Sequence, residues 1–240
     1  MKKVLCTVLS MVSMMNINTV EKKTVPKHHA YAVFANDNTK GLSHKLFKDA
    51  TTELKQQGYT VDEMFLYDHA DSMPFFFHSK EKMESNTFYM DNQKRFLQAD
   101  TLLIAFPMYW YSMPAIMKAW VDMINAWAYK YEKNGSVTPL HSIQKVIIIY
   151  TSMMDRDSLA QEIDRSIEPA SDDACNFLSM PHCTTQYSKQ LHYAIESQWK
   201  ETCKFLSIPH CTIHHVDSVY NLPAEKLEKH VAEIKKSCHL

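Results

Sequence analysis

Short apolar runs without alternating polar residues restrict how this chain can fold more than any other feature. TLLIAF, at residues 101–106, and KVIIIYTS, at 145–152, lack the in–out alternation of a strand with one wet face. Runs of this kind are typical of strands buried on both faces, as in parallel sheets covered by helices. Shorter candidate strands lie at 30–35, 60–68 and 211–216, so the sequence predicts five strands.

Helical patterns separate these strands. The first begins at Leu42 and ends at Gly58, a residue suited to a helix C-terminus. Others cover 90–100 and 223–237, and residues 69–90 are expected to be irregular. Strands that alternate with helices predict an open, doubly wound α/β sheet of parallel strands.

Ligands of such sheets bind beyond the carboxyl ends of the strands, where the strand order reverses. This rule brings together the loops at 36–43, 107–112 and 151–156. The middle loop carries the triplet Tyr109–Trp110–Tyr111, which cannot point into one core from a turn. An aromatic wall for a flat ligand is one interpretation, and a surface turn with half-buried aromatic residues is the other.

A proline-led helix follows the triplet. Ser112 is suited to cap it, and Pro114 fits its first turn. One side of the helix carries a stripe of large apolar residues, which predicts core packing, although a dimer interface would also use such residues. The stripe consists of Met117, Trp120, Val121, Ile124 and Trp127.

Composition bounds the class of protein. A chain of 240 residues with 45% hydrophobic residues can bury one sizeable core, which we assign to residues 29–240. A net charge of −1 argues against a nucleic-acid-binding protein, and no apolar run approaches the roughly 18 residues that a membrane helix needs. Residues 1–28 form an N-terminal extension. We expect a cytoplasmic protein, with export as the alternative if this extension acts as a signal peptide.

The segment RFLQADTLLIAFPMYWYSMPAIMKAWVDMI resembles the flavodoxin-like NAD(P)H:quinone oxidoreductases and the related FMN-dependent azoreductases. The resemblance covers roughly residues 30–155 and is weak beyond them. The matching positions are Phe106, Pro107, Tyr109, Trp110, Ser112, Pro114, Ala115, Lys118, Trp120 and Asp122.

The resemblance implies a flavodoxin-like three-layer sandwich with strand order 2-1-3-4-5. It also implies bound FMN or FAD, a hydride taken from NADH or NADPH, and two electrons passed to a quinone-like acceptor. In such enzymes the flavin performs the chemistry and the protein orients it. Relatives are commonly homodimers, which makes a homodimer the expected assembly.

Site residues follow from the same resemblance, although no catalytic residue can be assigned. Asn36, Gly41, Leu42 and Ser43 would approach the flavin phosphate and ribityl chain. Pro107, Met108, Tyr109, Trp110 and Tyr111 would lie along the ring. Thr151, Ser152 and Met153 would face its pyrimidine edge.

Two departures from the family keep other functions open. Relatives carry Thr-Thr-Gly-Gly where this chain has Thr151-Ser152-Met153-Met154, so two bulky side chains replace glycines. The family's later active-site Tyr and His have no counterpart in 156–200. A non-catalytic flavin-binding ancillary subunit is therefore the main alternative, and a one-electron carrier is a third.

Cysteine and histidine occur in two similar phrases, CNFLSMPHCTT at 175–185 and CKFLSIPHCTI at 203–213. Cys183, His182, Cys211 and His210 would suit zinc by ligand type. Adjacent residues of an extended chain point to opposite faces, however, so each Pro-His-Cys would divide its two ligands. We therefore predict no metal site and read the phrases as a local duplication or two similar helix-to-strand junctions.

Overall fold

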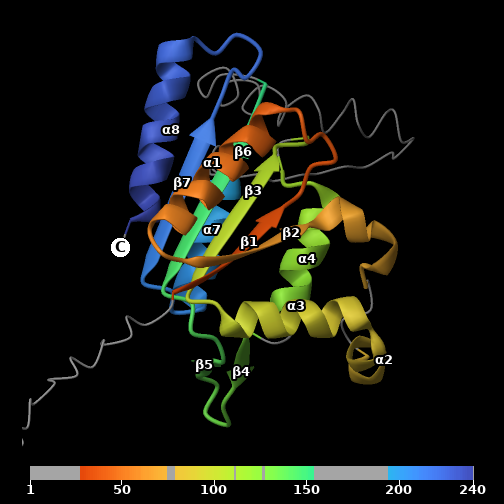
Figure 1. Ribbon diagram of the computed structural model, residues 1–240. Coiled ribbons are helices and arrows are strands. Elements are labelled where there is room, and N and C mark those ends of the chain that lie inside the picture. The colour runs from red at the N-terminus through yellow and green to blue at the C-terminus, as the bar shows by residue number, and fades with distance from the viewer. Residues whose placement is uncertain (1–27, 75–78, 111, 126–127, 154–193, 240) are drawn as a thin grey trace, which may run out of the picture.

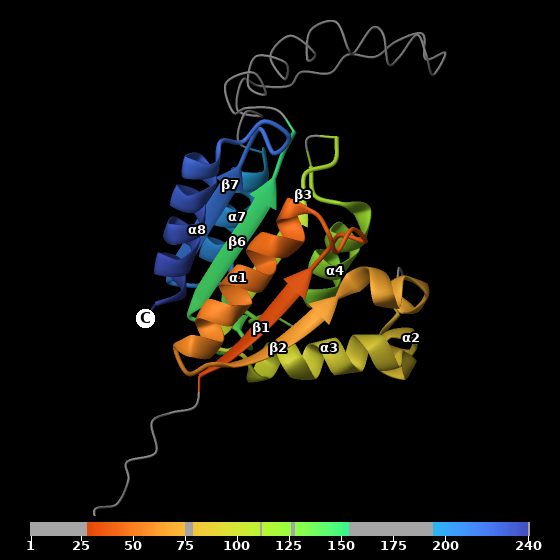
Figure 2. The same ribbon diagram turned by 45° about the horizontal axis from the view of Figure 1, so that its top comes forward.

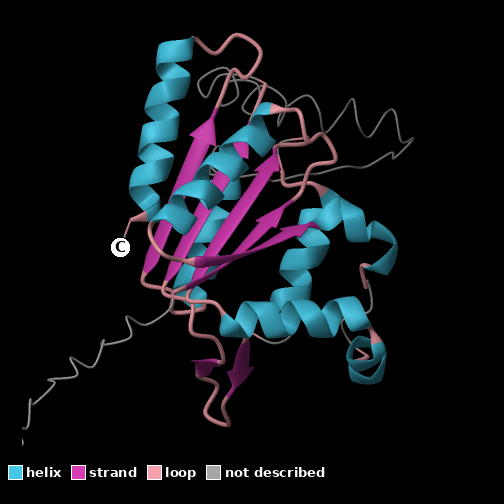
Figure 3. Cartoon of the chain, viewed as in Figure 1, coloured by secondary structure: helices cyan, strands magenta, loops and turns pink. Residues whose placement is uncertain are grey.

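A five-stranded parallel sheet forms the centre of the molecule. The computed structural model describes residues 28–74, 79–110, 112–125, 128–153 and 194–239. The strand order is β2-β1-β3-β6-β7, and Figure 3 shows the five arrowheads pointing the same way. This is the predicted 2-1-3-4-5 order. The strands are β1 (His29–Phe34), β2 (Thr60–Phe65), β3 (Thr101–Pro107), β6 (Lys145–Thr151) and β7 (His210–Val216).

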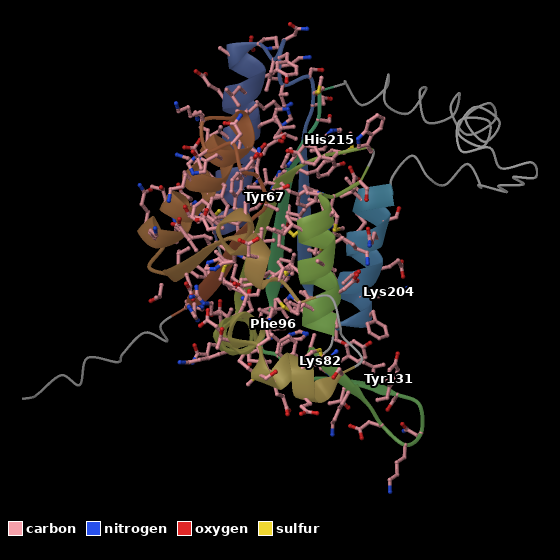
Figure 4. All side chains as sticks on the ribbon, turned by 90° about the vertical axis from the view of Figure 1, so that its right-hand side faces the viewer. Tyr67, Lys82, Phe96, Tyr131, Lys204 and His215 are labelled. Atoms are coloured by element: carbon pink, nitrogen blue, oxygen red, sulfur yellow. The ribbon has the colours of Figure 1, made fainter. Side chains whose placement is uncertain are left out.

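Helices cover both faces of this sheet (Figure 1). One face carries α1 (Leu42–Gln56) and α8 (Ala224–Cys238), which lie across the front of the sheet in Figure 2. The other face carries α3 (Thr87–Gln98), α4 (Ala115–Asn125) and α7 (Ala194–Phe205). Figure 4 shows the three layers from the side. The predicted three-layer α/β fold is confirmed.

Each strand of the middle of the sheet divides its side chains between two cores. In β3, Leu103 and Ala105 pack with α1 and α8, whereas Leu102, Ile104 and Phe106 pack with α3, α4 and α7. All five are buried. The apolar runs lack alternation because a strand covered on both faces places every side chain in a core.

The apolar stripe of α4 lies in the core between the sheet and helices α3, α4 and α7, as predicted. Met117, Trp120, Val121 and Ile124 are all buried. Trp120 also donates its indole Nε1–H to Asn92 Oδ1 of α3 at 3.0 Å. Trp127, the last predicted member, lies outside the described residues.

Two local predictions were wrong. Residues 69–90 are not wholly irregular, because a 3₁₀ helix η1 spans Leu66–Ser72 and α2 spans Lys80–Ser85. Asn86 caps α3 by accepting a hydrogen bond from Tyr89 N at 2.8 Å, so that helix begins before residue 90. The turn near Gly135 joins two strands that were not predicted, β4 (Tyr129–Tyr131) and β5 (Val137–Pro139). Their hairpin lies at the end of the sheet away from the arrowheads (Figure 3).

The chain ends bear on two further predictions. Most of the predicted extension, residues 1–27, lies outside the described residues. His28 immediately precedes β1, and its Nδ1 lies 2.8 Å from the Asp100 carboxylate. Among the described residues, no helix has the length and apolar content to cross a membrane.

Candidate functional site

A cavity of about 470 Å³ opens at the carboxyl ends of the strands. It lies where the strand order reverses, because β1 lies between β2 and β3. The chain continues from β1 into α1 on one face of the sheet and from β3 into α4 on the other face. All but two of the predicted site residues line it. The ten that do are Asn36, Gly41, Leu42, Ser43, Pro107, Met108, Tyr109, Thr151, Ser152 and Met153.

The loop between β1 and α1 is shaped by its own asparagines. Asn36 Oδ1 accepts a hydrogen bond from Asn38 N at 3.1 Å, and Asn38 Oδ1 accepts one from Lys40 N at 2.9 Å. A Cβ at Gly41 would lie 3.3 Å from Asn38 Nδ2, which is tight. Glycine therefore lets the loop turn closely into the helix.

Helix α1 begins at this loop without a side-chain cap. Gly41 occupies the N-cap position and makes no side-chain hydrogen bond there. The first N–H groups of a helix have no partner within the helix, and they attract anions together with the helix dipole. The start of α1 is therefore suited to a phosphate at the wall of the cavity.

The aromatic loop after β3 is closed by its own backbone. Tyr109 N donates to Ser112 O at 2.9 Å, and Ser112 N donates to Tyr109 O at 3.0 Å. Trp110, between them, has φ +49° and is 94% exposed. A bulky residue rarely adopts this left-handed conformation. Trp110 does not line the cavity, and Tyr111 lies outside the described residues.

Tyr109 links this loop to the one after β1. Its hydroxyl donates to Asn36 Oδ1 at 3.5 Å, the outer limit for a hydrogen bond. Partial burial, and then the carboxylate of Asp37, raise the pKa of the Tyr109 hydroxyl above its usual value. Tyr109 therefore stays protonated at neutral pH and presents an O–H donor at the edge of the cavity.

The end of β6 contributes two buried hydroxyl groups. Thr151 Oγ1 lies 2.8 Å from Ser43 Oγ of α1, and Ser152 Oγ lies 2.7 Å from His215 Nε2 of β7. Met108 N also donates to Thr151 O at 2.8 Å. These bonds connect the ends of β3, β6 and β7 with the start of α1, so this side of the cavity is held from several elements.

Charge is sparse in the cavity. Among the described residues that line it, Asp37 carries the only charged side chain. A phosphate bound here would be held by neutral donors, namely backbone N–H groups, asparagine amides and hydroxyls. A carboxylate nearby weakens anion binding by charge repulsion.

Comparison with known proteins identifies the family. The model of a family described as "Flavodoxin-like fold" matches residues 28–203. The chain belongs to this family. Its strand order and the position of its cavity agree with that assignment.

Several relatives of this flavodoxin-like chain are quinone reductases or azoreductases. A mouse protein named "Ribosyldihydronicotinamide dehydrogenase [quinone]" is 29% identical over 125 residues, which cover 43% of this chain and 53% of the mouse protein. The chain thus spans about half the length of the curated relatives it matches.

Two solved structures share the fold. The NAD(P)H:quinone oxidoreductase from Methanothermobacter marburgensis superposes with a TM-score of 0.62 at 16% identity, covering 88% of this chain and 96% of that one. An FMN-dependent NADH-azoreductase from Bacillus anthracis, solved with FMN, gives 0.61 at 17% identity over 88% and 97%. The predicted resemblance to these families is confirmed.

Sequence reasoning missed some lining residues of this flavodoxin-like domain. Asp37 and Asn38 belong to the predicted loop but were not assigned to the site. Val219 and Tyr220 follow β7, a fourth strand whose carboxyl end reaches the cavity. The rule that placed the other three loops applies equally to this one.

The described residues contain no candidate metal site, because no three of their His, Cys, Asp or Glu side chains lie close enough together to hold a metal ion. His210 and Cys211 stand in β7, while His182 and Cys183 lie outside the described residues.

Proposed function

We propose that this chain is a flavin-dependent NAD(P)H oxidoreductase. It would transfer two electrons from NADH or NADPH, through bound FMN or FAD, to a quinone or a similar acceptor. One observation carries the proposal: an uncapped helix start, an apolar wall and two hydroxyl groups border the same cavity of about 470 Å³. That volume lies within the usual range for small-molecule sites.

The helix start supports a place for the flavin phosphate. Gly41, Leu42 and Ser43, which form the start of α1, line the cavity, and glycine at residue 41 permits close approach. The residues present fit a phosphate held by neutral donors. FMN and FAD both satisfy this requirement.

The remaining walls support a place for the ring. Pro107, Met108 and Tyr109 offer an apolar surface to a flat heterocycle. Thr151 and Ser152 offer polar groups, which suit the edge of the ring that carries carbonyl and N–H groups. Met153 lines the cavity and is 68% exposed, so its side chain would have room to move aside for the ring.

The bound flavin would supply the hydride and electron chemistry. The protein's contributions would be position and exclusion of water. Apolar residues on one wall would keep water from the ring, and fixed hydroxyls on the other would set its orientation. The open mouth would admit the nicotinamide and the acceptor by turns.

A homodimer is part of the proposal. Two exposed apolar residues line the cavity, Tyr220 at 75% and Met153 at 68%, and Trp110, which is 94% exposed, directly follows the lining residue Tyr109 in the chain. Aromatic residues and methionine are enriched at protein interfaces. A second copy would cover these side chains and narrow the opening over the ring.

The visible absorption spectrum of the purified protein tests the function. The protein is reconstituted with FMN and, separately, with FAD, and then mixed anaerobically with NADH or NADPH. We expect flavin absorption bands that bleach on addition of the reductant and return on addition of a quinone.

Other outcomes have distinct meanings. A protein that takes up neither flavin would overturn the proposal. A protein that binds flavin but is not reduced by either nicotinamide would favour the non-catalytic ancillary subunit. A one-electron reduced form that persists during titration would favour an electron carrier.

A further inference from the structure

Two cysteines meet where α7 is followed by β7, at the end of the sheet opposite the cavity. Cys203 belongs to the last turn of α7, and Cys211 is the second residue of β7. Both are free thiols, and they lie within hydrogen-bonding reach of each other. Neither lines the cavity, so the proposed function uses neither.

The turn that joins the two cysteines is closed by backbone hydrogen bonds. Ile208 N donates to Cys203 O at 2.8 Å, and Ser207 N donates to Lys204 O at 3.0 Å. Ser207 has φ +57°, and this pair of bonds is the Schellman arrangement that ends many helices. The backbone of Cys203 is therefore fixed relative to the strand that follows.

Cys211 is held from the side of the sheet. It pairs with Val146 of β6, and the preceding His210 donates its N–H to Gln144 O at 3.2 Å. Its side chain packs against the core that contains Cys203. Helix α7 packs against β7, and Figure 4 shows it beside the sheet. The two thiols thus face each other from backbones that the fold holds in place.

The surroundings of the two thiols differ. Cys203 is 3% exposed, whereas Cys211 is only partly buried. The hydrogen bond with Cys203, aided by the positive charge of Lys200, lowers the pKa of Cys211 against the opposing effect of burial. The same hydrogen bond, and then burial, raise the pKa of Cys203. Cys211 is therefore the thiol that ionises first, and the thiolate is the reactive form of cysteine.

We propose that Cys211 is a peroxide-reactive thiol and Cys203 its resolving partner, so that oxidation joins α7 to β7 through a reversible disulfide. A sulfenic acid with a thiol beside it condenses to a disulfide, which thiol reductants reverse, whereas an isolated one is oxidised further. Cys203 thereby protects Cys211 from irreversible oxidation. The proposal goes beyond the proposed function and requires no bound flavin.

Hydrogen peroxide is the oxidant, and the reaction has two steps. The Cys211 thiolate attacks one peroxide oxygen and the O–O bond breaks, which gives Cys211 sulfenic acid and hydroxide. The hydroxide takes up the proton that Cys211 released. The Cys203 sulfur then attacks the Cys211 sulfur, an S–S bond forms, and the sulfenic hydroxyl leaves with the Cys203 proton as water. Two thiols lose two electrons and two protons, and one peroxide becomes two waters.

Tryptic peptide mapping of the full chain tests for the disulfide directly. Cleavage after Lys200, Lys204 and Lys226 places Cys203 in peptide 201–204 and Cys211 in peptide 205–226. The purified protein is treated with hydrogen peroxide, its remaining thiols are blocked with N-ethylmaleimide, and the digest is analysed by mass spectrometry. We expect the two peptides to be joined, with a mass two hydrogens below their sum, and to separate after treatment with dithiothreitol.

Variants separate the roles of the two thiols. In C203A the resolving thiol is absent, so dimedone should trap a sulfenic acid at residue 211, and longer oxidation should give products that dithiothreitol does not reverse. In C211S, Cys203 should remain a thiol. The matched control is C238S, because Cys238 lies in the other core, fully buried, and burial raises its pKa to about 12. C238S should form the disulfide as wild type does.

The labelling rates of the reduced protein give a second reading. We expect N-ethylmaleimide to modify Cys211 at least about tenfold faster than Cys203, the difference that one pKa unit makes in the thiolate fraction. Equal rates would overturn the assignment of Cys211 as the reactive thiol.

The remaining outcomes have distinct meanings. Recovery of both peptides as separate thiols after peroxide treatment would overturn the proposal, as would a disulfide from either residue to another cysteine of the chain. A joined pair of peptides in a protein that takes up no flavin would support this inference while the proposed function fails. A protein that reduces quinones but forms no such disulfide would lose this inference alone.

Discussion

The two sides of the cavity are built in opposite ways. At the end of β6, Thr151 and Ser152 are buried and bonded to Ser43 and His215 on other elements. In the loop after β3, the backbone of Tyr109 bonds Ser112 within the same turn, and Trp110 stands almost fully exposed. One side is fixed by the rest of the fold, and the other is closed mainly on itself.

This difference suggests a division of roles under the proposed function. A cofactor that must keep one orientation is best held by groups whose positions are set by several elements. Acceptors of varied shape are better met by side chains with room to adjust. The β6 side therefore suits the polar edge of the flavin, and the β3 loop suits the face where other molecules arrive.

Two tryptophans give the largest expected contrast. Trp120 is fully buried and bonded to Asn92, whereas Trp110, ten positions earlier, is 94% exposed. We expect W120A to lower the free energy of unfolding by about 3–5 kcal/mol. W110A should change it by no more than about 0.5 kcal/mol.

Urea unfolding followed by circular dichroism measures both variants. Similar losses for the two would mean that the aromatic loop is part of the folded core, and the proposed contrast between the two sides would be wrong. If W110A loses turnover of the acceptor without losing stability, this result would support the proposed contrast between the two sides of the cavity.

How much of this was predictable depends on what each feature needs. The runs at 101–106 and 145–152 predicted strands correctly, because a strand that is buried on both faces has consecutive apolar residues, which the sequence shows directly. The hairpin of β4 and β5 has three residues in each strand, too few for a period to appear. The partnership of Ser152 with His215 joins residues 63 apart in sequence, and only the pairing of β6 with β7 brings them together.

Removal of the Ser43–Thr151 hydrogen bond should give the next largest loss of stability. T151V removes one hydroxyl and leaves that of Ser43 buried at 5% exposure without its partner. An unsatisfied buried hydroxyl costs about 1–3 kcal/mol. We expect this loss of stability, measured in urea, together with weaker flavin binding, because the start of α1 loses its hydrogen bond to the end of β6.

The double variant S43A/T151V is the control. Removing both partners leaves no unsatisfied group, so stability should return close to wild type. If it falls further than in T151V alone, the bond is not the reason for the loss, and the β6 side is held by something else.

Asp37 should produce a smaller effect of opposite sign. As the only charged side chain among the described residues that line the cavity, it repels a phosphate bound at the start of α1. We expect D37N to tighten FMN binding by about two- to fivefold, the size of a partly screened charge interaction. Flavin fluorescence quenching at low and high salt measures it. The gain should shrink as salt rises, and a gain that salt leaves unchanged would argue against an electrostatic origin.

Substitution of Met153 should give the smallest change in flavin binding. It also tests the effect of having methionine where relatives have glycine. Met153 borders the cavity and is 68% exposed, and we expect its side chain to lie beside a bound flavin ring. We therefore expect M153G to change the flavin dissociation constant by less than about threefold, and to lower stability by about 0.5–1 kcal/mol through added backbone freedom. M153A, which trims the side chain without that freedom, is the matched control. A large gain in flavin affinity in both variants would mean that Met153 blocks the ring, and the β6 side would then limit binding as well as orient it.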